Sequence, residues 1–213
     1  MLSLSTGGGR FLVRLRDELR VYTDAGQLVS TIRVAALHAV LSPGGLGVAT
    51  TKGKIAQIWD ASSGKLLHTL HPRNSTVTDS SAVTDAEFSP NGLEVVTVSD
   101  DHMGRIWNVR SGHLLRVLVG HSFPVRAGSY SPDGHWIVTA SQFTAGLWSS
   151  GTGQLLFYLV GHTQPLTGAS FSPTGNWILT GSEDGTARVY HCVICQPLPG
   201  LVATAEARLR ALR

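Results

Sequence analysis

Two cysteines near the end of the chain have the spacing of a metal-binding or redox-active pair. Cys192 and Cys195 are separated by two residues, and His191 precedes them. A structural zinc site takes four ligands, often from two such pairs, and a redox motif of this spacing belongs to a βαβ context. We therefore expect two small, half-buried thiols at the end of a strand, no metal and no cofactor. A zinc ion shared between chains and a redox switch are the alternatives.

Other combinations that could support chemistry are incomplete. Gly7-Gly8-Gly9-Arg10 lacks the Gly-Lys-Ser/Thr ending of a phosphate-binding loop, and the chain has no Gly-x-Ser-x-Gly motif for a nucleophilic serine. Asp100-Asp101-His102 offers metal ligands, but it lies in a turn between two expected strands. The sequence therefore favours a protein that is not an enzyme.

Composition excludes several further classes. The chain has 17 Lys and Arg against 14 Asp and Glu, which gives little electrostatic reason for a nucleic-acid partner. Hydrophobic residues make up 42% of the chain, which opposes wholesale disorder. No apolar run approaches the ~18 residues that span a bilayer, and the N-terminus does not resemble a signal peptide. We expect a cytoplasmic protein with no nucleic-acid or membrane partner.

The elements that hold these residues repeat along the chain. A Ser-Pro-x-Gly turn after an aromatic residue occurs at Phe88, Tyr130 and Phe171, with Pro-to-Pro intervals of 42 and 41 residues. Each repeat has four short β runs; after Gly120 they cover 125–130, 136–141, 145–149 and 154–159. A four-stranded unit cannot bury both faces alone, so stacking around an axis, as in a propeller, is expected. An aromatic residue keeps the same period, at Trp59, Trp107, Trp148 and Tyr190.

These motifs together resemble the WD-repeat β-propeller family. The likeness covers about residues 1–191, weakly before residue 34, and is strongest from Gly161-His162 to Tyr190. It implies an all-β propeller of about five recognisable blades, acting as a non-catalytic scaffold or sensor that binds proteins. The blades are expected at 1–32 (partial), 33–70, 83–118, 125–159 and 166–190, the last without its outer strand.

The resemblance also implies a buried hydrogen-bond network of His, Ser or Thr, Asp and Trp within a blade. The residues that match are His162, Ser182, Asp184 and Tyr190 in the last repeat, His121, Ser141 and Trp148 in the one before, and Ser99, Asp101 and Trp107 before that. Tyr190 replaces Trp, and Gln142 stands at an Asp position. No repeat keeps the full set, and a structural role is expected for these residues.

The longest segment between two repeats, 71–82, is the main candidate for binding. It makes its connection six residues longer than the corresponding one after Leu118. Such loops lie on the face that propellers of this family most often use for partners, and loops on rigid scaffolds frequently bind ligands. A protein or peptide ligand is expected here, and a tolerated polar insertion is the alternative. The candidate contact residues are His71, Arg73, Asn74 and Asp79.

An enzyme is the rival hypothesis from a different class. Some propellers hydrolyse or lyse substrates at their central axis, which requires acids or histidines on the innermost strands. Asp85 and Glu87 are the only acids on the three inner strands expected at 83–88, 125–130 and 166–171. We therefore expect no catalytic residues.

The tail differs from the repeats. Its apolar residues recur at helical spacing, which predicts a short amphipathic helix within 192–213 that caps the propeller or docks on another protein. The tail is similar to the C-termini of bacterial multidomain proteins in which a propeller follows a signalling NTPase or another effector. Arg outnumbers Lys 14 to 3, which fits a GC-rich bacterial genome.

Closure of the ring is the last expectation. Propellers of this family usually have about seven blades, within a general range of about four to eight. With five, the ring is expected to stay open, as the C-terminal portion of a longer chain or as an arc completed by a second copy. Unclosed edges would then be available for self-association. A non-functional remnant is a further alternative.

Overall fold

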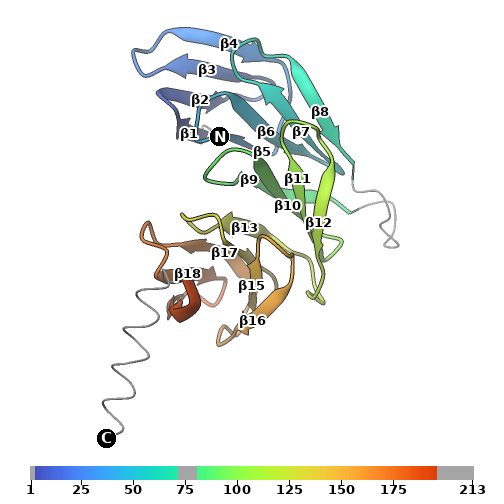
Figure 1. The fold of residues 1–213 in the computed structure, drawn as a ribbon, viewed down its shortest axis with the longest axis vertical. Helices are drawn as coiled ribbons and strands as arrows, with labels where there is room; N and C mark the ends of the chain where they lie inside the picture. The colour runs from blue at the N-terminus through green and yellow to red at the C-terminus, as the bar shows by residue number, and fades with distance from the viewer. Residues whose placement is uncertain (1–2, 72–80, 196–213) are drawn as a thin grey trace, which may run out of the picture.

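A computed structural model describes residues 3–71 and 81–195, and its strands form five antiparallel sheets that follow one another along the chain (Figure 1). The first sheet contains β1 (Ser3–Gly7), β2 (Arg10–Arg14), β3 (Leu19–Thr23) and β4 (Leu28–Ile32). The second contains β5 (His38–Leu41), β6 (Gly47–Lys52), β7 (Ile55–Asp60) and β8 (Leu66–Leu70). The third contains β9 (Val83–Phe88), β10 (Glu94–Ser99), β11 (Gly104–Asn108) and β12 (Leu114–Leu118).

The last two sheets differ in their number of strands. The fourth contains β13 (Ala127–Tyr130), β14 (Trp136–Ala140), β15 (Ala145–Ser149) and β16 (Leu155–Leu159). The fifth has three strands within the described residues: β17 (Leu166–Phe171), β18 (Trp177–Ser182) and β19 (Ala187–His191). The first sheet, expected to be partial, has four strands.

The Ser-Pro-x-Gly motif makes the hairpin between the first two strands of a sheet. The Ser131 hydroxyl accepts a hydrogen bond from the Trp136 amide at 2.9 Å, and Ser89 accepts from Glu94 at the same distance. Gly134 has a φ of 75°, a left-handed conformation that a side chain disfavours. The repeated turn therefore fixes the register of each hairpin.

Consecutive sheets pack face to face and the core lies between them. Because side chains alternate along a strand, each sheet has one face toward the next sheet and one toward the previous sheet. We call these the forward face and the backward face. In the cluster between the third and fourth sheets, for example, Val96 and Ile106 meet Ile137 and Trp148.

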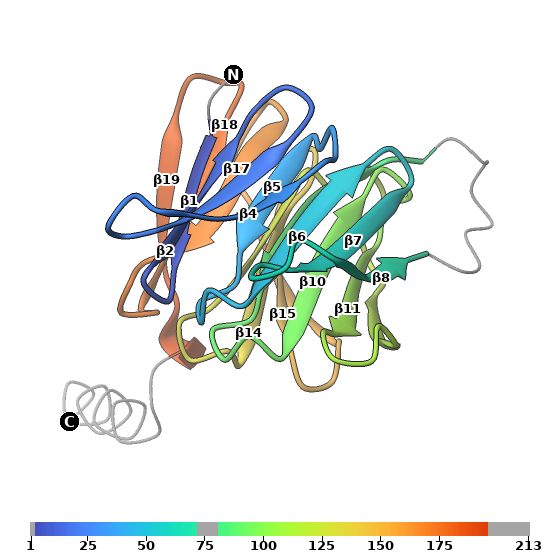
Figure 2. The ribbon, with the colours of Figure 1, turned by 90° about the horizontal axis from the view of Figure 1, so that it is seen from above.

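The five sheets form an arc, with the first and the fifth at its two ends (Figure 1); Figure 2 shows the same arc from above, a view in which the first sheet overlaps the fifth. The all-β fold is confirmed. After β19 the chain makes a 3-10 turn, Val193–Cys195, while 196–213, where the helix is expected, lie outside the described residues. Across the part of the chain that is described, no helix has the length and apolar character needed to cross a bilayer.

Candidate functional site

His162 is the centre of a hydrogen-bond network in the fifth sheet. Its Nδ1 lies 2.8 Å from Asp184 Oδ2, and its Nε2 lies 2.9 Å from Thr180 Oγ1. The Thr186 hydroxyl donates to Asp184 at 2.6 Å. This bond first, and then the bond to His162, hold the pKa of the Asp184 carboxyl well below its usual range. The network ties the loop before β17 to the β18–β19 turn.

Ser182 and Tyr190, the other two expected members, do not bond the ring of His162, although Ser182 Oγ accepts a hydrogen bond from the backbone amide of Asp184 at 3.1 Å. Ser182 Oγ donates to the carbonyl of Gln164 at 2.9 Å, and Tyr190 donates to the carbonyl of Val160 at 3.0 Å. Ser182 ends β18, so its hydroxyl meets the incoming loop rather than the ring of His162. The network hydroxyl is Thr180, two residues earlier on the strand.

In the fourth sheet the network closes around Trp148 instead. Trp148 Nε1 donates to Thr139 Oγ1 at 2.7 Å, and His121 Nε2 lies 2.7 Å from the same oxygen. Ser141 again bonds loop carbonyls, those of Phe123 and Pro124. Burial lowers the pKa of His121 to about 4, so its ring is neutral at physiological pH.

The third sheet satisfies its aspartate in another way. Asp101 pairs with Arg105 at 2.7 Å, and both side chains are almost fully buried. Trp107 donates to Thr97 at 2.8 Å, while Ser99 donates to the carbonyl of Ala82. The arginine thus supplies the positive partner where no histidine is available.

In these sheets a threonine supplies the hydroxyl that bonds the Trp or His ring, while Ser182 and Ser99 accept hydrogen bonds from the backbone amides of Asp184 and Asp101 at 3.1 and 3.3 Å. This threonine lies near the middle of the second strand, and the second sheet adds a fourth example in the bond of Trp59 to Thr50 at 3.0 Å. The signal was present as a Thr nine or ten residues before the Trp, at Thr50, Thr97 and Thr139. The buried hydroxyls and rings bond each other, which fits a structural role.

The innermost strands carry a separate set of titratable groups. His38 Nδ1 lies 3.0 Å from Asp85 Oδ1, and this contact raises the pKa of His38. Burial raises the pKa of Glu87 to about 7. Asp85 accepts a hydrogen bond from the Gly128 amide and Glu87 accepts one from the Tyr130 amide, at 3.2 and 3.1 Å.

These groups link three consecutive sheets at their inner strands. The two acidic side chains of β9 bond amides of β13 in the next sheet, which is a structural use of these groups. Within the described ranges, no group of three or more His, Cys, Asp or Glu is placed to hold a metal ion.

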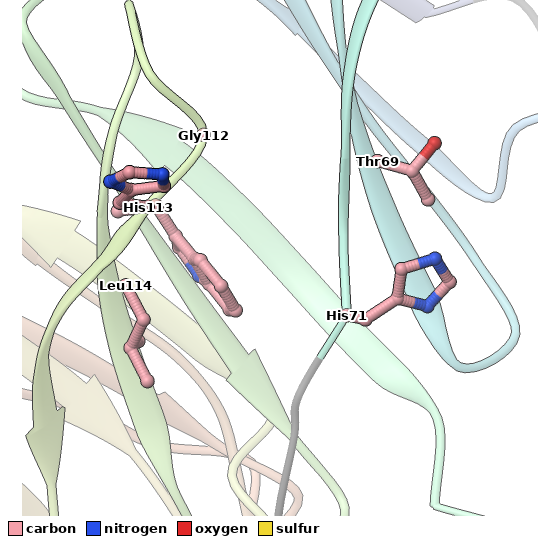
Figure 3. Close-up of a pocket in the computed structure, with 6 residues that line it drawn as sticks. Thr69, His71, Gly112, His113 and Leu114 are labelled. Carbon is pink, nitrogen blue, oxygen red and sulfur yellow. The ribbon is translucent and has the colours of Figure 1, made fainter.

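A cavity of about 490 Å³ lies beside the third sheet, at the base of the candidate loop. Figure 3 shows His71 and Thr69 on one side and His113 and Leu114 on the other. His71 is the one candidate loop residue that the structure describes, while Arg73, Asn74 and Asp79 lie outside the described residues. His113 and Leu114, which the third sheet adds to the lining, were not predicted, because they follow a Ser-Gly turn that recurs in other repeats. The full lining is Thr69, His71, Trp107, Gly112, His113 and Leu114.

A second cavity, of about 300 Å³, lies at the short turn of the fourth sheet. The rings of Phe123 and Phe143 stand edge to face on its rim with centroids 6.3 Å apart, and both side chains are exposed. His121 and Tyr158 also contribute to the lining. In this turn the motif pattern marks only Gln142, at an Asp position, and gives no indication of the two aromatic rings.

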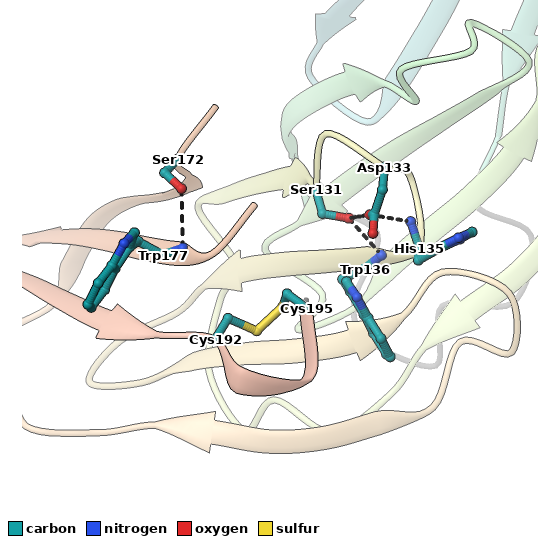
Figure 4. Close-up of a disulfide and its surroundings, with 8 residues drawn as sticks. All are labelled: Ser131, Asp133, His135, Trp136, Ser172, Trp177, Cys192 and Cys195. Atoms are coloured by element: carbon teal, nitrogen blue, oxygen red, sulfur yellow. Dashed lines mark hydrogen bonds between the residues drawn. A yellow bond between two sulfur atoms is a disulfide. The ribbon is translucent and has the colours of Figure 1, made fainter. Parts of the chain in front are cut away.

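Cys192 and Cys195 are joined by a disulfide (Figure 4). Both are buried in the cluster between the fourth and fifth sheets, and Trp136 packs against this cluster. The expectation of half-buried free thiols is therefore wrong. The bonded sulfurs are also not thiolates, so the pair in this form cannot act as zinc ligands. Residue spacing alone could not show that the turn after β19 brings the two side chains together.

Comparison with known proteins agrees with this geometry. Residues 64–108, 112–149 and 153–191, more than half of the chain, match the family described as WD domain, G-beta repeat. DENN domain and WD repeat-containing protein SCD1 of Arabidopsis thaliana is 33% identical over 97 residues, which are 46% of this chain and 8% of that protein. WD repeat and SOCS box-containing protein 1 of Homo sapiens is 36% identical over 90 residues, 41% of this chain and 20% of that protein. The matches thus span a fifth or less of these relatives.

Proposed function

Because the chain belongs to the WD40 repeat family, whose members generally act as protein-interaction scaffolds, we propose that it is a non-catalytic module that binds a peptide segment of a partner protein. The cavity beside His71 is the observation that carries this proposal. It has the size of a small-ligand pocket, and it lies at the base of the longest loop between repeats. A rigid sheet supplies its other wall, so binding would cost little ordering of the protein.

The lining suggests how a peptide is held. Leu114 and the ring of Trp107 offer apolar contact, while His71, His113 and Thr69 offer hydrogen-bonding groups on opposite walls. Aromatic side chains with a few polar groups around them are typical of binding hot spots. This composition fits an apolar peptide side chain flanked by backbone groups.

The test is a peptide-library selection against the whole chain, followed by fluorescence polarisation with the selected peptides. Leu114→Asp should weaken their binding by about tenfold or more, because it places a charge in an apolar contact. Leu115→Asp is the matched control, since this neighbour is equally exposed but does not line the cavity. Failure to select any peptide, or equal binding by both variants, would contradict the proposal.

The wider setting is also part of the proposal. We place the module as the C-terminal portion of a bacterial signalling protein that carries its NTPase or effector in another domain. The Tyr-x-Cys-x-x-Cys step and the excess of Arg over Lys support this, although the relatives named above are eukaryotic. Protein partners at the sheet ends and self-association at the unclosed edges complete the proposal.

A further inference from the structure

The sheet at the C-terminal end of the arc exposes a face that the other four sheets bury. Strands two and three of each sheet place one pair of opposed residues on the forward face. These pairs are Leu12–Val21, Ala49–Ile58, Val96–Ile106, Val138–Leu147 and Leu179–Val189. The eight residues of the first four pairs are 0 or 1% exposed, whereas Leu179 is 47% and Val189 is 62% exposed.

This exposed forward face is apolar well beyond that pair. Trp177, two residues before Leu179 on the same face, is 47% exposed, and its ring is tilted against the ring of His191 with centroids 4.6 Å apart. No Asp, Glu, Lys or Arg belongs to this set of four, which are Trp177, Leu179, Val189 and His191. A contiguous apolar patch of this kind marks an interaction surface.

The sheet at the other end of the arc exposes the complementary face. On the backward face, the residue pairs in the second to fifth sheets are Val48–Trp59, Val95–Trp107, Ile137–Trp148 and Ile178–Tyr190. The corresponding pair in the first sheet is Phe11–Tyr22, whose rings stack at 5.2 Å and are only partly buried.

Inside the chain these two kinds of face always meet each other. Val138 and Leu147 of the fourth sheet share a core cluster with Ile178 of the fifth. Ile58 of the second shares one with Trp107 of the third. The four internal interfaces therefore define one packing mode, forward face on backward face.

From this we propose that the forward face of the fifth sheet binds the backward face of the first sheet of a second copy. Leu179 and Val189 of one copy would pack on Phe11 and Tyr22 of the next, as forward and backward pairs pack within the chain. The contact is heterologous, so copies join head to tail and form a ring if the rotation closes or an open chain if it does not. This rests on the self-association proposed above and assigns it to two named faces.

Sedimentation equilibrium from low to high micromolar concentration tests the proposal. The wild-type protein should reach at least twice the monomer mass, whereas Leu179→Glu/Val189→Glu should remain monomeric. Leu93→Glu, at a residue 63% exposed in the β9–β10 hairpin, is the control and should assemble like wild type. Circular dichroism checks that each variant keeps its sheet content.

Mixing two blocked variants tests the polarity of the contact. Phe11→Glu blocks the backward face and should also be monomeric, but mixed with Leu179→Glu/Val189→Glu it should give a complex of one copy of each. An isologous contact between two identical faces would give no such complex. A wild-type monomer at all concentrations, or a Leu179→Glu/Val189→Glu protein that assembles normally, would overturn the proposal. A monomeric variant that still binds the selected peptides would leave the proposed function intact.

Discussion

The fourth and fifth sheets are built from neighbouring copies of one repeat, yet they differ in what stabilises them. The fifth has the histidine and the aspartate of the motif, and His162 bonds both Asp184 and Thr180. The fourth lacks the aspartate, but Trp148 is fully buried and bonds Thr139. It has four strands and a sheet on either side, whereas the described part of the fifth has three strands and one open face.

The repeat that matches the family motif best is thus the one that is covered least. The hydrogen bonds of the motif residues attach a loop to its own sheet. The burial of a sheet depends instead on the neighbouring sheets that pack on its two faces. We therefore expect the fourth sheet to contribute more to the free energy of unfolding, despite its incomplete motif.

The largest expected effect comes from removing the aromatic residue at the end of the third strand. Trp148→Ala should lower the free energy of unfolding by about 3–5 kcal/mol, because it leaves a cavity in a fully buried site. Tyr190→Ala, at a partly exposed site, should cost about 1 kcal/mol. Urea denaturation of both variants measures the difference, and equal losses would remove the distinction between the two sheets.

The next effect concerns the buried hydroxyl of each sheet. Thr139→Val leaves both Trp148 and His121 without a partner and should cost about 2–3 kcal/mol, whereas Thr180→Val affects His162 alone and should cost about 1 kcal/mol. Thermal and urea unfolding provide the measurement. If Ser141→Ala proved more costly than Thr139→Val, the assignment of the threonine to the network would be incorrect.

A pH-dependent effect distinguishes how the two sheets are attached at their inner strands. Glu87, on the inner strand of the third sheet, bonds the amide of Tyr130 in the fourth sheet. At the equivalent position on its own inner strand, which faces the fifth sheet, the fourth sheet has Ser129 instead of an acid. The pKa of Glu87 is raised from 4.5 to about 7, so the folded state retains its proton longer than the unfolded state. The stability from this group is complete below pH 4.5 and is lost as the pH rises through 7.

Glu87→Gln should therefore equal wild type near pH 4 and be more stable by about 1–3 kcal/mol at pH 8. Comparing the two proteins at each pH cancels the contribution of His121, which titrates in both. A difference that does not change with pH would show that Glu87 is not a buried, protonated link.

The smallest effect tests the missing aspartate directly. Replacing Gln142-Phe143-Thr144 with the Glu-Asp-Gly-Thr turn of the fifth sheet should give His121 a carboxylate partner. Its pKa should then rise from about 4, because a nearby negative charge favours the imidazolium. NMR titration of the His121 ring follows this, and an unchanged pKa would mean that the turn does not control the network.

The sequence predicted the sheets well because their signal is periodic. The Ser-Pro-x-Gly turns and the Trp positions mark the same point in each repeat, so strands such as β15 fall where they were expected. The networks were predicted less well, since a Ser at a strand end and a Thr inside the strand look equivalent in a linear motif. Only the register shows that Thr139 lies within hydrogen-bond distance of the Trp148 indole N–H.

Features that depend on contact between distant segments could not be predicted. The cavity joins His71, which follows the last strand of the second sheet, to His113, which precedes the last strand of the third and is 42 residues away in the sequence. The Cys192–Cys195 disulfide depends on the turn that follows β19. Val189 is exposed because no further sheet of the described fold packs on its face. The apolar sequence of the strand does not indicate whether such a sheet is present.

Hydrogen exchange of the two sheets tests the central claim most directly. At a concentration too low for self-association, amides of β14 and β15 should be protected by about tenfold or more over those of β18 and β19, because only the fourth sheet is packed on both faces. Raising the concentration should increase protection in β18 and β19 while leaving β14 and β15 unchanged. Equal protection of the two sheets in dilute protein would contradict the account.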